Sequence, residues 1–330
     1  MKKGQWYHEQ FMCRKQTTYN LITMSRNILI CDFDETITIK DTINLLAKLA
    51  YRVKPELKPE WSHFETTYMN GYNELQPIYS RNRLLPLLSQ IYRDHVKIND
   101  ENFRGLFGSE IEYQKLCRNI EINSMIEMEK YHVFKGVTEQ DVKEYINIFD
   151  EPVIREGFFD CLKELNIQLN QLYILSINWS GEFIHNIISS TYLQSSSIYC
   201  NNLLVDTAHG AYTGLFSKKL LTGSDKIQTL QKICQNNKKD DTIWYIGDSE
   251  TDLLSILYPG INGILLLDPN ENERKFNKIT RNILGIESEL LSKFNIDETR
   301  YIKFIEKQNN MGSYLVKNWA DITTLLQFHN

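Results

Sequence analysis

ILICDFDETITIKD, residues 28–41, runs from a short apolar segment directly into three acidic side chains, Asp32, Asp34 and Glu35. Apolar, β-branched runs of this length are typical of strands that are buried on both faces of a parallel sheet. Ligands of open parallel sheets gather outside the carboxyl ends of the strands. The clustered acids therefore lie where a functional site is expected. Their negative charges have to be offset by nearby cations.

Further along the chain, buried-strand patterns alternate with helical ones. Runs like the first, over 27–31, follow at 172–177, 242–247 and 263–267. Helical patterns lie between them at 158–169, 181–193 and 225–234. This alternation predicts a Rossmann-like, doubly wound α/β fold with a parallel sheet. We also predict a final helix over 314–326 that closes the core.

Between the first and second predicted strands lies a long segment with helical periodicity over 41–53, 61–80 and 111–134. A segment of that length within one crossover is too long for a loop. We predict an inserted all-helical cap domain. The expected division is an N-terminal extension at 1–26, an α/β core at 27–40 and 153–330, and the cap at 41–152.

Charge and composition limit the kinds of binding partner that the sequence favours. The 330 residues carry a formal net charge of −5, which gives no reason to expect nucleic acid or an acidic membrane surface. Six single cysteines without a C-x-x-C pair indicate reduced thiols, and no apolar run reaches the about 20 residues of a spanning helix. We expect a soluble, cytoplasmic protein, as monomer or homodimer. Residues 1–23 read as a disordered extension or a weak organelle-import peptide.

Polar residues also follow the other predicted strands. Ser176 ends the second strand, GDSETD at 247–252 ends the third, and Lys226 starts the helix before the third. Together these residues resemble the four motifs of the haloacid dehalogenase superfamily, in the right order and over nearly the whole chain from about residue 27. The motifs are D-x-D-x-T at Asp32, Asp34 and Thr36, then the serine, the lysine, and G-D-x-x-x-D at Gly247, Asp248 and Asp252.

The resemblance implies a phosphatase whose nucleophile is Asp32, forming an aspartyl-phosphate, with Asp34 as general acid and base. Mg²⁺ would be held by Asp32, the main-chain carbonyl of Asp34, and Asp248, with Asp252 and Gly247 in support. The phosphate-binding residues it implies are Ser176, Ile177, Asn178, Lys226 and Thr36. Lys218 and Lys219 remain alternatives to Lys226.

The predicted cap resembles that of the phosphoserine phosphatase and nucleotidase branches, which implies a small phosphorylated metabolite as substrate. A looser resemblance links the segments around 175–184, 244–257 and 263–267 to plant domains that cleave thiamine monophosphate, and to related fungal proteins. Trp179 and Glu35 would suit a flat cationic ring, or would be a packed hinge and a solvated loop residue. A phosphotransferase and a non-catalytic phospholigand-binding protein stay open as alternatives, and so does a structural Ca²⁺ site at the two aspartates.

Overall fold

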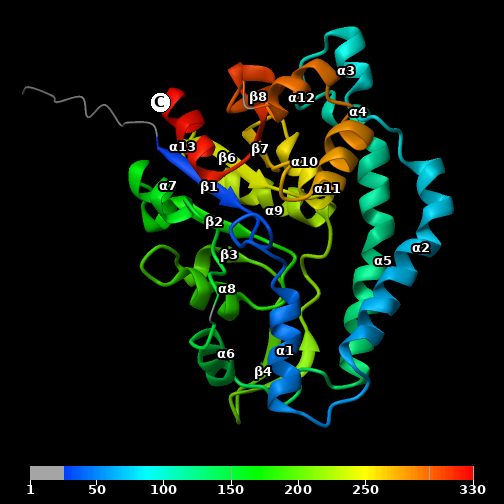
Figure 1. Ribbon diagram of the computed structural model, residues 1–330, viewed down its shortest axis with the longest axis vertical. Coiled ribbons are helices and arrows are strands. Elements are labelled where there is room, and N and C mark those ends of the chain that lie inside the picture. Colours follow the sequence, from blue (N-terminus) through cyan, green and yellow to red (C-terminus); the bar gives the residue numbers. More distant parts are fainter. Residues whose placement is uncertain (1–25, 150, 297, 330) are drawn as a thin grey trace, which may run out of the picture.

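The fold is built around a seven-stranded sheet with the strand order β3-β2-β1-β6-β7-β9-β8 (Figure 1). The computed structural model describes residues 26–149, 151–296 and 298–329, so the predicted extension lies outside it except for Arg26. All neighbouring strands are parallel except the β8–β9 pair. The strands of this sheet are β1 (Asn27–Cys31), β2 (Leu172–Leu175), β3 (Ile198–Tyr199), β6 (Thr242–Gly247), β7 (Asn262–Leu266), β8 (Tyr301–Glu306) and β9 (Gly312–Val316).

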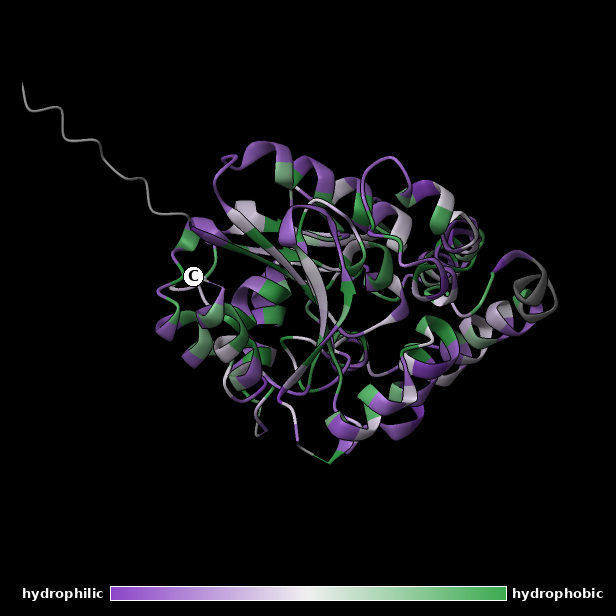
Figure 2. Ribbon diagram, turned by 90° about the horizontal axis from the view of Figure 1, so that it is seen from above, coloured by the Kyte–Doolittle hydropathy of each residue, from purple (hydrophilic) through white to green (hydrophobic). Residues whose placement is uncertain are grey.

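The sheet is buried on both faces, which explains why its central strands are continuous apolar runs. Successive side chains of a strand point to opposite faces, so Leu29 and Cys31 enter one apolar cluster and Ile28 and Ile30 the other. Helices cover both faces, and purple and green alternate along them (Figure 2). The prediction of a doubly wound α/β fold with a parallel sheet is confirmed, except that β8 pairs with β9 antiparallel.

Two groups of helices provide these covers. The cluster of Leu29 includes residues of α1 (Ile43–Val53), α7 (Phe158–Glu164), α8 (Gly181–Ile188) and α13 (Trp319–Phe328). The cluster of Ile28 includes residues of α3 (Ser89–Asp94), α4 (Phe103–Leu106), α9 (Gly223–Asn236), α10 (Leu253–Ile256), α11 (Glu273–Asn277) and α12 (Ser288–Asn295). Thus α3 and α4, from the segment predicted as cap, pack against the α/β core. The division into domains stays a prediction.

The predicted final helix over 314–326 is wrong in its first part. Residues 312–316 form β9, which pairs with β7 and β8, and the helix begins only at Trp319. The Asn318 side chain caps this helix by accepting a hydrogen bond from the Asp321 amide at 2.9 Å. A short apolar run does not distinguish strand from helix by itself, and the cap at Asn318 is the local signal that separates them.

A second, two-stranded sheet of β4 (Leu203–Asp206) and β5 (Ala211–Phe216) was not predicted. It packs with the segment that follows α5 (Gly108–Lys130) and with α6 (Glu139–Ile146), where Gly136 donates to the Tyr212 carbonyl and Thr138 bridges to Ala211. Figure 1 shows this group and α1 on one side of the main sheet.

The longest helices, α2 (Trp61–Asn82) and α5, run side by side (Figure 1). The hydroxyls of Tyr68 and Tyr72 on α2 both donate to Oε1 of Glu121 on α5, each at 2.9 Å. Burial raises the pKa of Glu121 to about 7, although both hydrogen bonds oppose the shift. The aromatic side chains at helical spacing in α2 thus contribute to packing between these two helices.

Glu121→Gln is expected to change the pH dependence of stability. The carboxyl has its ordinary pKa of 4.5 in the unfolded chain and about 7 in the folded protein, so the folded state binds more protons between these values. The contribution of Glu121 to stability therefore falls as the pH rises through this window, by on the order of 2 kcal/mol, because the residue is only partly buried. The glutamine variant should not show this loss. The measurement is the free energy of unfolding in urea at the lower and the upper pH of the window.

The matched control is Glu112→Gln, which removes an exposed carboxylate from the same helix. It should shift stability equally at both pH values. A Glu121→Gln variant with the same pH dependence as the wild type would contradict the raised pKa.

Candidate active site

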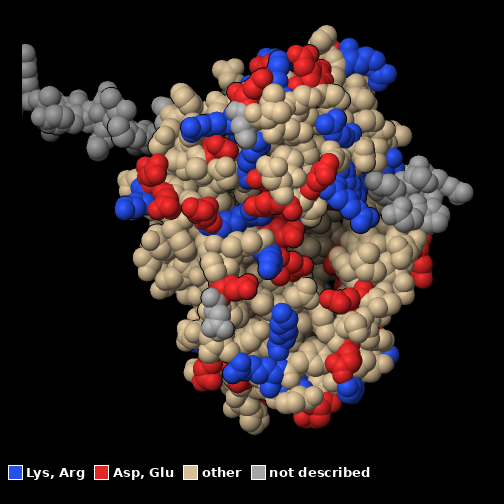
Figure 3. Space-filling model, in the orientation of Figure 1, with Lys and Arg blue, Asp and Glu red and all other residues tan. Residues whose placement is uncertain are grey.

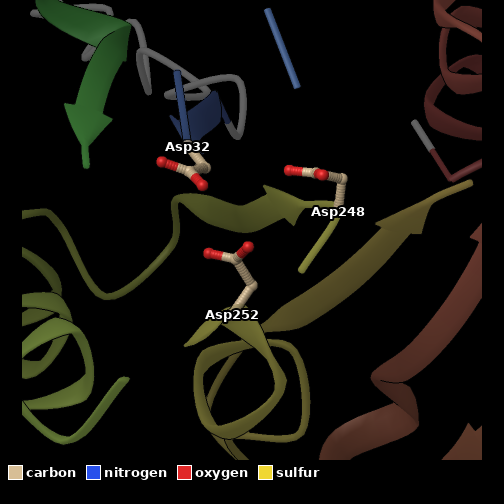
Figure 4. A group of neighbouring side chains, drawn as sticks. All are labelled: Asp32, Asp248 and Asp252. Carbon is tan, nitrogen blue, oxygen red and sulfur yellow. The ribbon is translucent and has the colours of Figure 1, made fainter. Parts of the chain in front are cut away.

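Three buried carboxylates meet where β1 and β6 end. Asp32 follows β1, Asp248 follows β6, and Asp252 comes from the turn after Asp248 (Figure 4). One oxygen from each lies within 4.8 Å of the others, and the three residues are at most 5% exposed. Hard cations such as Mg²⁺ prefer carboxylate oxygens, so the donor chemistry fits a divalent ion.

The sheet register brings these residues together. β1 and β6 are parallel neighbours with Cys31 opposite Ile246, and the Asp32 amide donates to the Ile246 carbonyl at 2.8 Å. Gly247 is required for a steric reason, since a Cβ atom there would lie 2.4 Å from Cγ of Asp252. The glycine thus lets the Asp252 side chain fold back over the strand end.

Lys226 lies between two of the three carboxylates. Its fully buried ammonium is 3.0 Å from Oδ2 of Asp32 and 2.6 Å from Oδ1 of Asp252. Burial alone would lower the pKa of Lys226, but the charges of Asp252 and Asp32 outweigh burial and raise it. Burial would raise the pKa of Asp252, and Lys226 turns this into a net decrease. Both groups are therefore charged at neutral pH.

The alternative lysines differ in position. Lys218 forms an ion pair with Glu129, away from the carboxylate cluster, whereas Lys226 is in direct contact with Asp32. The structure thus places Lys226 beside Asp32, and its binding of phosphate stays a prediction. The main-chain amide of Lys219 donates a hydrogen bond to the Asn201 side chain.

A second lysine, which the motifs of the sequence did not indicate, lies at the cluster. The ammonium of Lys275 forms ion pairs with Asp248 and Glu35. Burial raises the pKa of Asp248 to about 6, against the opposing charge of Lys275. Lys275 lies in the first turn of α11, after β7, and the Asn272 side chain caps that turn. A lysine in a capped turn after a core strand was the only sequence signal for it.

The Asp34 side chain is held by hydrogen bonds to two neighbouring residues, Thr42 and Asn178. Its Oδ1 accepts from the Thr42 amide at 2.7 Å and the Thr42 hydroxyl at 2.6 Å, and its Oδ2 accepts from Asn178 at 2.9 Å. Burial raises the pKa of Asp34 in spite of these hydrogen bonds. A raised pKa suits a carboxyl that has to donate a proton.

The other predicted phosphate-binding residues follow β2, the neighbour of β1. Ser176 is buried, and its Oγ accepts a hydrogen bond from the Asn178 amide at 3.2 Å. Ile177 lies between them and is partly buried. The loop therefore lies beside Asp32, and Asn178 links it to Asp34.

Trp179 lies in a packed aromatic cluster. Its ring is edge-on to those of Phe134, Phe216 and Trp61, with centroids 5.5–6.4 Å away, and the residue is 7% exposed. Little of the ring is open to a ligand in this conformation. Its role in specificity, like that of Glu35 beside Lys275, stays a prediction.

Thr36 connects the two acidic motifs. Its buried hydroxyl donates to Oδ1 of Asp248 at 2.7 Å, across 212 positions of sequence. The side chain that was predicted to contact phosphate thus contacts a carboxylate, and it fixes the orientation of Asp248.

Thr36→Val should destabilise the protein, because it leaves a buried acceptor without its donor at nearly constant volume. The expected loss is about 1–3 kcal/mol in the free energy of unfolding, measured with urea. Thr36→Ser keeps the hydroxyl and is the matched control. Equal stability of the two variants would show that the hydrogen bond to Asp248 contributes nothing.

On the face seen in Figure 1, acidic and basic side chains gather around a hollow (Figure 3). The hollow lies between the part that holds the main sheet and the part that holds α1, α2 and α5. Among the described residues, no helix combines the length and apolar character needed to cross a membrane.

The strand order and the grouping of the three aspartates agree with the α/β fold that the resemblance to the haloacid dehalogenase superfamily implies. The chain belongs to the same family as cold tolerance protein 1 of Saccharomyces cerevisiae. It is 42% identical over 314 residues to cold tolerance protein 1 of Saccharomyces cerevisiae, covering 91% of this chain and 98% of that one. It is 26% identical to a CTO1 family protein of Schizosaccharomyces pombe, covering 68% and 76%.

A more distant relative is the mitochondrial bifunctional TH2 protein of Arabidopsis thaliana, 24% identical over 89% of this chain. The match spans 48% of that protein's length. No protein-family model matches the chain. Among solved structures, a phosphoserine phosphohydrolase-like protein from Francisella tularensis aligns over 92% of this chain and 100% of its own, with 14% identity and a TM-score of 0.46. Phosphoserine phosphatase in its apo form aligns over 76% and 90%, with 15% identity and a TM-score of 0.39.

Proposed function

We propose that the protein is a Mg²⁺-dependent phosphomonoesterase that hydrolyses a small phosphorylated metabolite through an aspartyl-phosphate. The observation that carries the proposal is the buried group of Asp32, Asp248 and Asp252 with Lys226 paired to Asp32. Burying three carboxylates costs free energy unless cations offset their charge. Such a group at the carboxyl ends of parallel strands is suited to chemistry on an anionic substrate.

The residues that would hold the ion are Asp32, Asp248 and the main-chain carbonyl of Asp34, an all-oxygen set. A bound Mg²⁺ would offset the negative charges of the carboxylates and of the phosphate, so that they can approach each other. Lys226 contributes a positive charge in direct contact with Asp32. It is placed to bind phosphoryl oxygens, over which transition-state charge is spread.

In the first step, a carboxylate oxygen of Asp32 attacks phosphorus. The bond from phosphorus to the ester oxygen breaks, and Asp34 gives its proton to the departing oxygen. In the second step, Asp34 takes a proton from water, whose oxygen attacks phosphorus and releases Asp32 and phosphate. Thr42 and Asn178 hold the Asp34 carboxyl in one orientation for both transfers.

Thiamine monophosphate is our first candidate substrate, from the resemblance of the site segments to plant domains that cleave it. Phosphoserine and nucleoside monophosphates are the alternatives. A groove of about 860 Å³ next to the site supports a small leaving group of partly apolar character, since Glu35, Thr42, Tyr145 and Phe149 are among its lining residues. Organic leaving groups of metabolite size fit grooves of this volume.

The test is hydrolysis of an aryl phosphate by purified protein, with Mg²⁺ and with excess EDTA, followed by a panel of the phosphorylated metabolites named above. We expect turnover that EDTA abolishes and Mg²⁺ restores. Stabilisation by beryllofluoride and Mg²⁺ without turnover of any phosphomonoester would instead indicate a phospholigand-binding protein. Transfer of phosphate to added alcohols would indicate a phosphotransferase.

A further inference from the structure

Lys275 is a cation at the acidic cluster that the proposed chemistry does not use. Its ammonium is paired with Oδ2 of Asp248 and with Glu35. The other oxygen of Asp248 accepts the Thr36 hydroxyl at 2.7 Å. Both oxygens of this predicted metal ligand are therefore engaged by side chains of the protein itself.

An ammonium and a divalent ion cannot both occupy the Oδ2 side of Asp248. Mg²⁺ binds carboxylate oxygens at about 2.0–2.1 Å, so the two cations would lie within about 4 Å of each other in a buried site. Like charges at that separation repel, and the repulsion beside a carboxylate that is 3% exposed is stronger than it would be in water. One of the two cations has to leave.

We propose that Lys275 is a resident cation that occupies Asp248 in the absence of a divalent ion and moves to Glu35 alone when the ion binds. The inference rests on the metal site of the proposed function. It adds that a side chain of the protein competes with the divalent ion for Asp248. Lys275 thereby sets the ion concentration at which the site fills.

The geometry provides both positions for the ammonium. Glu35 is already its second partner, and the Glu35 side chain is 42% exposed, so water can solvate that pair. The backbone of Glu35 is fixed, since its carbonyl accepts from Arg155 at 3.0 Å and its amide donates to Thr38 at 3.1 Å. The ammonium can therefore leave Asp248 without a rearrangement of the loop.

The backbone of Lys275 is fixed as well. Its amide donates to the Asn272 side chain at 3.0 Å in the first turn of α11. Only the four-carbon stem of the side chain has to rotate, and a flexible lysine with a single compact charge suits this exchange better than arginine would. The movement thus involves one side chain between two carboxylates.

The experiment is a Mn²⁺ titration followed by electron paramagnetic resonance and calorimetry, with Mn²⁺ as the probe ion. It compares wild type, Lys275→Met and Lys278→Met at about pH 8.5, where Asp248 is ionised. Lys278 is the matched control, because it lies three residues on and pairs with Glu250, outside the three-carboxylate cluster. We expect Lys275→Met to lower the Kd for Mn²⁺ by about tenfold or more, and Lys278→Met by less than about threefold.

Glu35→Gln provides a second, independent test of the competition. It removes the second partner of Lys275, so Mn²⁺ binding should weaken several-fold in the presence of Lys275 and much less in the Lys275→Met background. Unchanged or weaker binding in Lys275→Met, or an equal effect of Glu35→Gln in both backgrounds, would overturn the inference. Circular dichroism checks that each variant is folded.

Asp248→Asn separates this inference from the proposed function. Loss of Mn²⁺ binding in Asp248→Asn, together with no gain in Lys275→Met, would leave the metal site standing and refute the competition. Absence of Mn²⁺ binding from wild type and Lys275→Met alike, or binding that does not need Asp248, would refute both.

Discussion

Asp32→Asn is expected to abolish phosphatase activity, with a fall in kcat of about 10⁴-fold or more, because an amide oxygen cannot form the acyl phosphate. Folding should survive the change. Burial raises the pKa of Asp32 well above its usual value, which means that the charged form is costly there, and Lys226 keeps Asp252 as a partner. Initial rates with an aryl phosphate and thermal unfolding measure both effects.

The control for Asp32→Asn is Asp206→Asn, which changes an aspartate in the β4–β5 hairpin, outside the carboxylate cluster. It should keep activity within about twofold, as surface changes away from a site usually do. Activity above about 1% of wild type in a well-folded Asp32→Asn protein would contradict the nucleophile assignment, since removal of a nucleophile normally costs far more.

Asp34→Asn is expected to slow turnover by about 10²–10⁴-fold and to change its kinetic form. An activated aryl phosphate has a leaving group that departs without a proton, so the first step should proceed. The second step needs a base and should become slow. A burst of one nitrophenolate per protein, followed by slow release, is the result expected in stopped-flow measurements with nitrophenyl phosphate.

An alkyl phosphate provides the comparison for Asp34→Asn. Its leaving oxygen needs a proton, so both steps suffer and no burst should occur. Equal losses for aryl and alkyl phosphates, without a burst for either, would contradict the assignment of both proton transfers to Asp34.

Much of the fold could be predicted because the central strands are buried on both faces. β1 and β6 coincide with apolar runs of the sequence, and their register puts Asp32 beside the end of β6. The edge elements carry weaker signals. β9 is a short apolar run that also fits a helix, and β4–β5 has exposed apolar residues such as Leu204 and Leu215 instead of a regular alternation.

The candidate site was predictable where it follows strand ends and not where tertiary packing supplies it. Asp32, Asp248 and Lys226 lie in motifs and are brought together. Lys275 lies 27 positions after Asp248 on a separate helix, and the packing of α11 into the apolar cluster on one face of the sheet brings it there. The Thr36 hydrogen bond to Asp248 is likewise a long-range contact that no local pattern encodes.

Trapping the phosphorylated protein tests the central claim most directly. Asp34→Asn protein would be mixed with nitrophenyl phosphate and Mg²⁺, quenched, and treated with borohydride, which reduces an acyl phosphate of aspartate to homoserine. Peptide mass spectrometry should find homoserine at position 32, dependent on substrate and absent when Asp32 is also replaced by asparagine. Steady hydrolysis with unmodified aspartate at position 32 in every quenched sample would contradict the account.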